Sequence, residues 1–239
     1  MPLATATLPK PSGLGFTTFT RIVVLIAFYF LGGILGRESS FLDGQVSLVW
    51  PPSGIALAAI LLFGYEFWPG VVIGALLCTY MKGHPSGFFT LGTALGNTFG
   101  AVVSTYLLER LVRFKNPMES VKDAAGFIVL GAGLGTTVNA CFTVASLVYD
   151  AGNLEILDFF GHTLEWWLPN AMAGLVVTPA IITWASPSSM SWRPKLIAEA
   201  CACAVLLVVA TLASPADLAF QYAEPRPWKS NHLGFAAAN

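Results

Sequence analysis

Charged residues are scarce in this sequence. Aspartate, glutamate, lysine and arginine make up 10% of its 239 residues, whereas 55% are hydrophobic. A soluble domain normally has about a quarter of its residues charged. The mean hydropathy of +0.69 agrees, so the sequence predicts an integral membrane protein with the lipid bilayer as its main partner. The formal net charge of −1 does not bear on nucleic-acid binding, and we expect no nucleic-acid partner.

The residue patterns of catalytic and metal centres are also missing. The three histidines, His84, His162 and His232, are scattered, and the four cysteines fall within apolar runs without zinc-like spacing. No Ser/His/Asp set, glycine-rich phosphate loop or H-E-x-x-H motif is visible. We therefore expect no enzyme activity, no metal and no cofactor. The cysteines are interpreted as small packing residues in lipid.

Long apolar runs are present instead. A membrane-spanning helix needs about 20 apolar residues. The sequence predicts an all-α polytopic membrane protein, a bundle of about seven transmembrane helices. The segments are 16–35, 48–63, 68–80, 88–108, 124–148, 164–184 and 196–212.

Two prolines divide the second segment. Residues 50–54 (WPPSG) precede the apolar run 55–63. Proline lacks a backbone N–H group and clashes with the preceding turn, so a helix can start at Pro51 or Pro52 but cannot run through them unbroken. The pattern predicts a Pro-interrupted second helix whose outer end is broken or re-entrant. The alternative is a simple helix start at the membrane interface, with Trp50 as an aromatic anchor.

Lysine and arginine indicate the orientation. Cytoplasmic loops are enriched in these residues, and the loop 109–123 carries four of them. The loop 149–161 carries three acidic residues and no basic one, which is typical of the outside. We therefore expect a cytoplasmic N-terminal segment (1–15), a transmembrane domain (16–212) and a polar, periplasmic tail (213–239) that stops before further helices.

Glycines recur at a spacing of four. Gly92, Gly96 and Gly100 share one helix face, and similar pairs occur at 32/36, 70/74 and 131/135. Small residues at this spacing let membrane helices approach closely. The pattern favours packing within the bundle, and the alternative is a homodimer formed through such a face.

Polar side chains within the bilayer are costly and are often functional. With the N-terminus inside, several of them fall at a similar depth in the outer half of the membrane. The sequence predicts an outer, ligand-binding cavity, with hydrogen bonding between helices as the alternative. Glu165, beside two tryptophans, can also simply face water. The candidate residues are Trp50, Ser53, Asn97, Asn139, Glu165, Trp167 and Asn170.

Several short motifs resemble one known family. Residues 50–58 (WPPSGIALA), 62–65 (LFGY) and 68–70 (WPG) resemble the first family of bacterial membrane-associated sensor domains, MASE1. Residues 95–98 (LGNT) and 166–168 (WWL) are similar to its pattern, as is Asp123 before the fifth segment. The resemblance runs from about residue 20 to about residue 212. It implies an N-terminal input domain of a histidine kinase or diguanylate cyclase in the bacterial inner membrane, as in two-component systems.

Two departures from the family pattern concern the ligand. The family often has an acidic residue where this chain has Gly100, and Gly-Asp where this chain has Pro169-Asn170. The resemblance therefore implies a different ligand, or none. No kinase or cyclase module follows in this sequence, so the implied function is a sensory input domain without its output, binding a small ligand or a membrane partner protein.

A second function class stays open. The chain also resembles the compact substrate-binding membrane components of energy-coupling-factor importers, in helix count and glycine-rich packing. A third alternative is a structural remnant that binds nothing.

Overall fold

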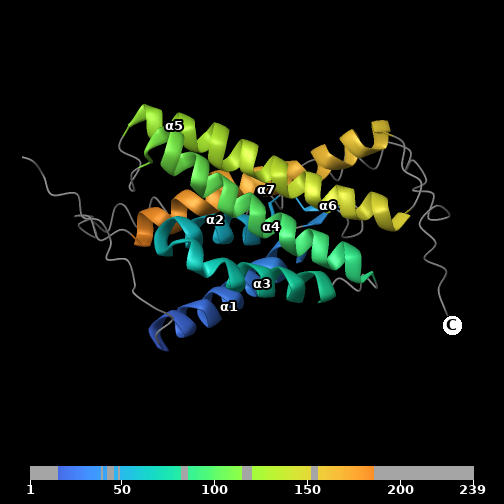
Figure 1. Cartoon of the computed structure of the whole chain (residues 1–239), viewed down its shortest axis with the longest axis horizontal. Helices are drawn as coiled ribbons and strands as arrows, with labels where there is room; N and C mark the ends of the chain where they lie inside the picture. Colours follow the sequence, from blue (N-terminus) through green and yellow to red (C-terminus); the bar gives the residue numbers. More distant parts are fainter. Residues whose placement is uncertain are drawn as a thin grey trace, which may run out of the picture.

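Six helical rods form a bundle in the computed structural model, which describes residues 16–38, 40–41, 46–47, 49–81, 86–114, 120–151 and 156–185 (Figure 1). The fourth rod combines α4 with a π-helical end, η2, and the fifth is a continuous run of α5, π-helical η3 and α6. The helices are α1 (Phe16–Glu38), α2 (Pro51–Phe63), α3 (Trp68–Met81), α4 (Gly87–Leu107), η2 (Leu108–Val112), α5 (Val121–Gly126), η3 (Phe127–Leu134), α6 (Gly135–Ala151) and α7 (Ile156–Ala185).

The all-α class is confirmed. The first six predicted segments each correspond to one rod, and the seventh, 196–212, lies outside the described residues. The only strands in the described part are a pair of two residues each. β1 (Ser40–Phe41) pairs antiparallel with β2 (Val46–Ser47) in the connection between α1 and α2.

Three of the described helices are long and apolar enough to cross a membrane by length and composition. They cover Thr17–Arg37, Val121–Asp150 and Phe159–Ala185, and Pro51–Phe63 is a shorter apolar helix. α4 is 21 residues long but buries five polar side chains on its inner face. It therefore places polar groups inside the bundle.

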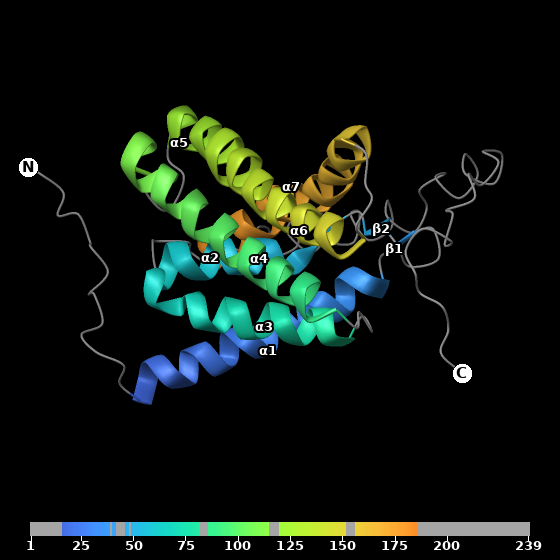
Figure 2. The ribbon, with the colours of Figure 1, turned by 45° about the vertical axis from the view of Figure 1, so that its right-hand side comes forward.

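The bundle has α2 and α4 at its centre. α2 packs against α1, α4 and α7, and α4 packs along α3 and α6. Figures 1 and 2 show α1 and α3 on one side of the bundle and the α5–α6 rod on the other. A 3₁₀ turn, η1 (Tyr65–Phe67), follows Gly64, which has a φ of +101°, and connects α2 to α3.

The glycine faces are packed inside the bundle. A Cβ built on Gly92 would lie 2.3 Å from Ser146 Cβ, and one on Gly96 would lie 2.9 Å from the carbonyl oxygen of Asn139. Gly100 is equally crowded by the backbone of Gly135. α4 and α6 can therefore approach this closely only because these positions lack side chains.

The predicted interruption of the second helix is wrong. α2 begins at Pro51 and continues to Phe63, and the described residues just before it, 46–47 and 49–50, are not helical. Pro51 and Pro52 therefore start the helix. This agrees with the preference of proline for the first helical turn, where an N–H group has no helical acceptor.

The start of α2 lies deep in the bundle. The backbone N–H of Trp50 donates to the carbonyl oxygen of Pro169 at 3.0 Å. Pro169 comes 13 residues after Ile156, the first residue of α7, which is about 20 Å along the helix axis. A helix start normally leaves several N–H groups unpaired. Here both prolines lack that group, and the N–H of Ser53 bonds to the Trp50 carbonyl at 3.1 Å, so the buried start leaves few donors unsatisfied.

Candidate functional site

Four polar side chains from four helices meet inside the bundle. They are Ser53 on α2, Asn97 on α4, Asn139 on α6 and Asn170 on α7. The three asparagines are only 7%, 4% and 3% exposed, and all four groups are uncharged. The structure thus brings together four of the seven predicted site residues.

These side chains surround a shared set of hydrogen bonds, which we call the polar ring. Asn139 Nδ2 donates to Asn97 Oδ1 at 3.3 Å and to Asn170 Oδ1 at 3.2 Å. The Ser53 hydroxyl faces the same two acceptors, Asn97 Oδ1 at 3.4 Å and Asn170 Oδ1. A hydroxyl has one proton to donate, so Ser53 bonds to one acceptor at a time. Donors and acceptors therefore alternate around the ring.

Each asparagine is also anchored to its own helix by a bond to a residue four positions away. Asn97 Nδ2 donates to the Thr93 carbonyl at 2.8 Å, and Asn170 Nδ2 donates to the Trp166 carbonyl. The Thr143 hydroxyl donates to Asn139 Oδ1 at 3.3 Å. These bonds fix how each amide faces the ring. Such a satisfied buried network can define one arrangement of the helices.

A small cavity lies beside the ring. The space open to the centre of a water molecule is about 20 Å³. One water requires about 10–15 Å³ on this measure, whereas pockets for drug-sized ligands have about 300–1,000 Å³. In this arrangement the cavity therefore accommodates a single water molecule. Its lining is Ser53, Leu57, Asn97, Gly100, Ala101, Ser104, Gly131, Gly135, Thr136, Asn139 and Gly174.

The other three predicted site residues lie elsewhere. The Trp50 ring packs against Gly36, where a Cβ would lie 2.9 Å from Trp50 Cε3. The Trp167 indole N–H donates to the Gly133 carbonyl at 3.0 Å. The side chain of Glu165 is 60% exposed and pairs with His162 Nδ1 at 2.9 Å. None of the three lines the cavity, and ligand binding by the seven residues stays a prediction.

Most of the sequence matches one known protein family. A family model, MASE1, matches residues 21–223. The chain belongs to the MASE1 family. MASE1 is a membrane-associated sensory input domain and is not itself catalytic. Comparisons with curated proteins and with solved structures gave no match.

The MASE1 match covers every residue of the polar ring and the cavity. Within the described ranges, no group of three or more His, Cys, Asp or Glu side chains is placed to hold a metal ion. The site of this MASE1 domain is therefore built from neutral amides, hydroxyls and backbone groups. Its chemistry is hydrogen bonding.

Positions 100 and 170, where the resemblance implied departures from the family pattern, both lie at this site. Asn170 belongs to the ring, and Gly100 lines the cavity. A Cβ on Gly100 would lie 2.9 Å from the Gly135 carbonyl oxygen and 3.0 Å from Asn139 Cβ. An acidic side chain at position 100 would not fit this arrangement of α4 and α6.

Sequence reasoning missed most of the cavity wall. Gly100, Ala101 and Ser104 follow Asn97 at spacings of three, four and seven, so they share its helix face. Extending from Asn97 by these steps would have found them. Gly131 and Gly174 also line the cavity, and neither has a polar side chain that could have marked it as a site residue.

Proposed function

We propose that this MASE1 chain is a multi-pass signal-input domain of a bacterial inner membrane, switched by a small ligand or membrane partner that opens the polar ring. The ring carries this proposal because it joins four helices around one cavity. Hydrogen bonds between membrane helices contribute only about 0.6 kcal/mol each on average. A ligand that offers its own donors and acceptors can therefore replace them.

The mechanism is a shift between a closed and an open arrangement of these helices. The closed arrangement holds about one water, so a ligand of several heavy atoms binds only when the helices separate. A ligand shifts such an equilibrium only by its difference in affinity between the two states. Because none of the described side chains lining the cavity is ionisable, the open state offers amide and hydroxyl groups to its ligand.

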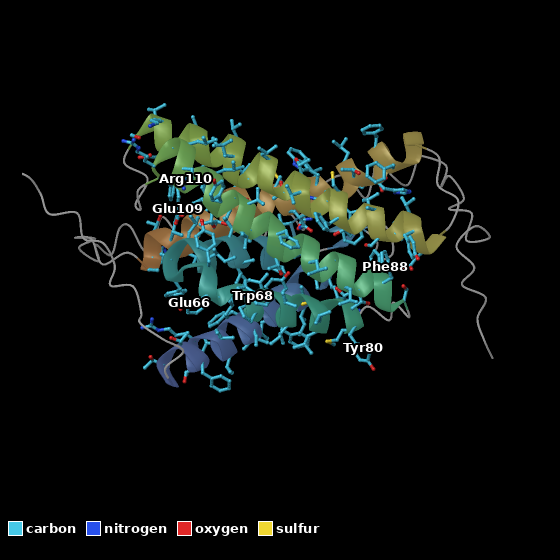
Figure 3. The ribbon with its side chains drawn as sticks, in the orientation of Figure 1. Glu66, Trp68, Tyr80, Phe88, Glu109 and Arg110 are labelled. Atoms are coloured by element: carbon cyan, nitrogen blue, oxygen red, sulfur yellow. The ribbon has the colours of Figure 1, made fainter. Side chains whose placement is uncertain are left out.

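The distribution of cations supports a cytoplasmic N-terminus. Of the described lysines and arginines, Arg21, Arg110, Arg113 and Lys122 lie at one end of the bundle and Arg37 at the other. Figure 3 shows Glu66, Glu109 and Arg110 at the first end, with Tyr80 and Phe88 at the opposite end. Cytoplasmic ends carry the excess of positive residues, so the first end is the inner one in this proposal.

The depth of the ring supports access from within the membrane or from outside. Asn170 lies 11 residues after Phe159, the first residue of a 27-residue apolar span. At 1.5 Å per residue this is about 16 Å along a span of about 40 Å. The ring therefore lies near the middle of the span, slightly nearer its outer end.

Thermal unfolding of the purified chain in lipid nanodiscs tests the proposal. The parent is screened with neutral amides, polyols, sugars and amino acids, and with a bacterial polar-lipid extract. A solute that raises the melting temperature of the parent should lose this effect with Asn97→Ala and Asn170→Ala. Glu165→Gln is the matched control, because that carboxylate is exposed and does not reach the ring. If both ring variants respond as the parent does, the ring is not the binding site.

A further inference from the structure

A π-helical segment separates the polar ring from the inner end of the bundle. η3, Phe127–Leu134, lies within the continuous rod between α5 and α6. π-Helical turns are rare, occur mostly as single-turn insertions within α-helices, and are frequent at functional sites. Here the segment is eight residues long.

The outer end of this segment forms part of the cavity. Gly131, Gly135 and Thr136 line it, and Asn139 of the polar ring follows one turn later. Glycine at two of these positions lets the backbone itself form the wall. A change in the backbone register of η3 therefore alters the cavity directly.

Side chains of neighbouring helices hold the carbonyl groups of the segment. Ser104 Oγ on α4 donates to the Gly131 carbonyl at 2.9 Å. The Trp167 indole N–H on α7 donates to the Gly133 carbonyl at 3.0 Å. These two bonds, from two different helices, fix the π-helical register from outside the rod.

The inner end of the segment contacts a second π-helical turn. Phe127 packs with Leu108 and Val112 of η2 in one buried cluster. A Cβ on Gly126 would lie 2.4 Å from Val112 Cγ2, so the two rods are in close contact here. Any rotation of α5 must therefore move its inner-end residues against η2.

We propose that residues 127–134 are a two-state register joint, held in the π-helical register by Ser104 and Trp167, which carries the state of the cavity to the inner end. This inference rests on the proposed sensory function. Each residue of register shift rotates an α-helix by about 100° and advances it about 1.5 Å. Conversion of η3 to an α-helical register thus turns α5, with Lys122, relative to the rest of the bundle.

Distance measurements between two spin labels test the joint. The labels are placed by Lys122→Cys on α5 and Glu66→Cys in η1, in a full-length chain whose own cysteines are replaced by alanine. Trp167→Phe, which removes the indole donor and keeps an aromatic ring, should add a second distance displaced by an amount on the order of 10 Å, the diameter of a helix. Ser104→Ala should do the same. Trp166→Phe is the control, because its ring packs against Phe89, and it should leave one distance.

Single-residue deletions provide an independent test. Deleting Ile128, an exposed residue of η3, removes the inserted residue of the π-helical run, so η3 becomes α-helical with α5 and α6 in their parent positions. The chain should remain folded with the parent distance, and adding Trp167→Phe to the deletion should give no second distance. Deleting Ala145 within α6 is the control, and it should unfold the bundle because no π-helical turn absorbs it. The joint is refuted if the Ile128 deletion unfolds like the control, if Trp167→Phe still gives a second distance in the deleted chain, or if Trp167→Phe alone changes nothing. No ligand is used here, so this result is separate from the solute-binding test.

Discussion

The hydroxyl of Ser104 occupies the space that a side chain at Gly135 would need. A Cβ built on Gly135 would lie 1.6 Å from Ser104 Oγ, far inside the contact distance of nonbonded atoms. Ser104 cannot simply turn away, because its hydroxyl bonds to the Gly131 carbonyl at 2.9 Å. The close approach of α4 and α6, and with it the position of Asn139, depends on this glycine.

Gly135→Ala should therefore destabilise the bundle. Added atoms in a packed core cost about 1–3 kcal/mol, so the melting temperature in nanodiscs should fall. Gly161→Ala is the control, because nothing lies within 4 Å of its Cβ position. That change should be neutral or favourable by up to about 1 kcal/mol from helix propensity. Equal effects of the two substitutions would contradict the packing described here.

Pro52→Ala should also destabilise the bundle. Pro52 is buried at the start of α2, and alanine there introduces an N–H group inside the bundle. An unsatisfied buried donor costs about 1–3 kcal/mol. Pro69→Ala adds the same group in the first turn of α3, at a position that is half-buried rather than buried, and should cost less. The comparison of the two melting temperatures checks the depth of the α2 start.

Asn139→Leu should destabilise the chain more than the loss of a single hydrogen bond. It removes both donors to Asn97 and Asn170 and the acceptor of Thr143. Leaving such groups unpaired costs about 1–3 kcal/mol. Thr137→Val on the same rod serves as the control, since the Thr137 hydroxyl bonds only to the Gly133 carbonyl of its own rod. If the two variants have the same melting temperature, the polar ring does not stabilise the bundle.

Much of the bundle could be predicted from the sequence, because apolar runs and glycine spacing follow directly from the physics of helices in lipid. The six described rods and the inward glycine faces agree with that pattern. The start of α2 was harder to predict. The prolines indicated a boundary, but whether it lay at the interface or deep in the bundle depended on the bond between Trp50 and Pro169. That contact joins residues 119 positions apart in sequence.

The candidate site was predictable in its polar members only. Asn97, Asn139 and Asn170 were conspicuous because amides are rare in apolar runs, and their similar depth indicated that they meet. Depth alone could not predict which way a side chain faces. Glu165 and Trp167 lie within five residues of Asn170. Their side chains nevertheless do not line the cavity, because successive residues of a helix face different directions.

The contact between Tyr65 and Glu109 at the cation-rich end of the bundle should make stability depend on pH. The Tyr65 hydroxyl donates to Glu109 Oε2 at 2.8 Å. Partial burial, followed by this bond, raises the pKa of the Tyr65 hydroxyl above its ordinary value of 10.0. Above pH 10 the unfolded chain therefore loses this proton while the folded chain keeps it, and stability falls as pH rises towards the raised pKa. Thermal unfolding between pH 8 and pH 11 should show a steeper loss for the parent than for Tyr65→Phe. Tyr80→Phe, whose ring is 80% exposed, should follow the parent.

Cysteine labelling in intact cells should establish the orientation of the bundle. Lys122 and Asp150 are exposed residues near opposite ends of the same rod, α5 to α6. With the cation-rich end in the cytoplasm, a membrane-impermeant maleimide should label Asp150→Cys in intact cells, and Lys122→Cys only after the cells are opened. The unmodified chain supplies the background from its own cysteines. Because 28 residues separate the two positions, or about 42 Å of helix, the rod is long enough to place them on opposite sides of a bilayer. The reverse labelling pattern would invert the orientation and place the inner-end contacts, including Tyr65 with Glu109, on the outer side.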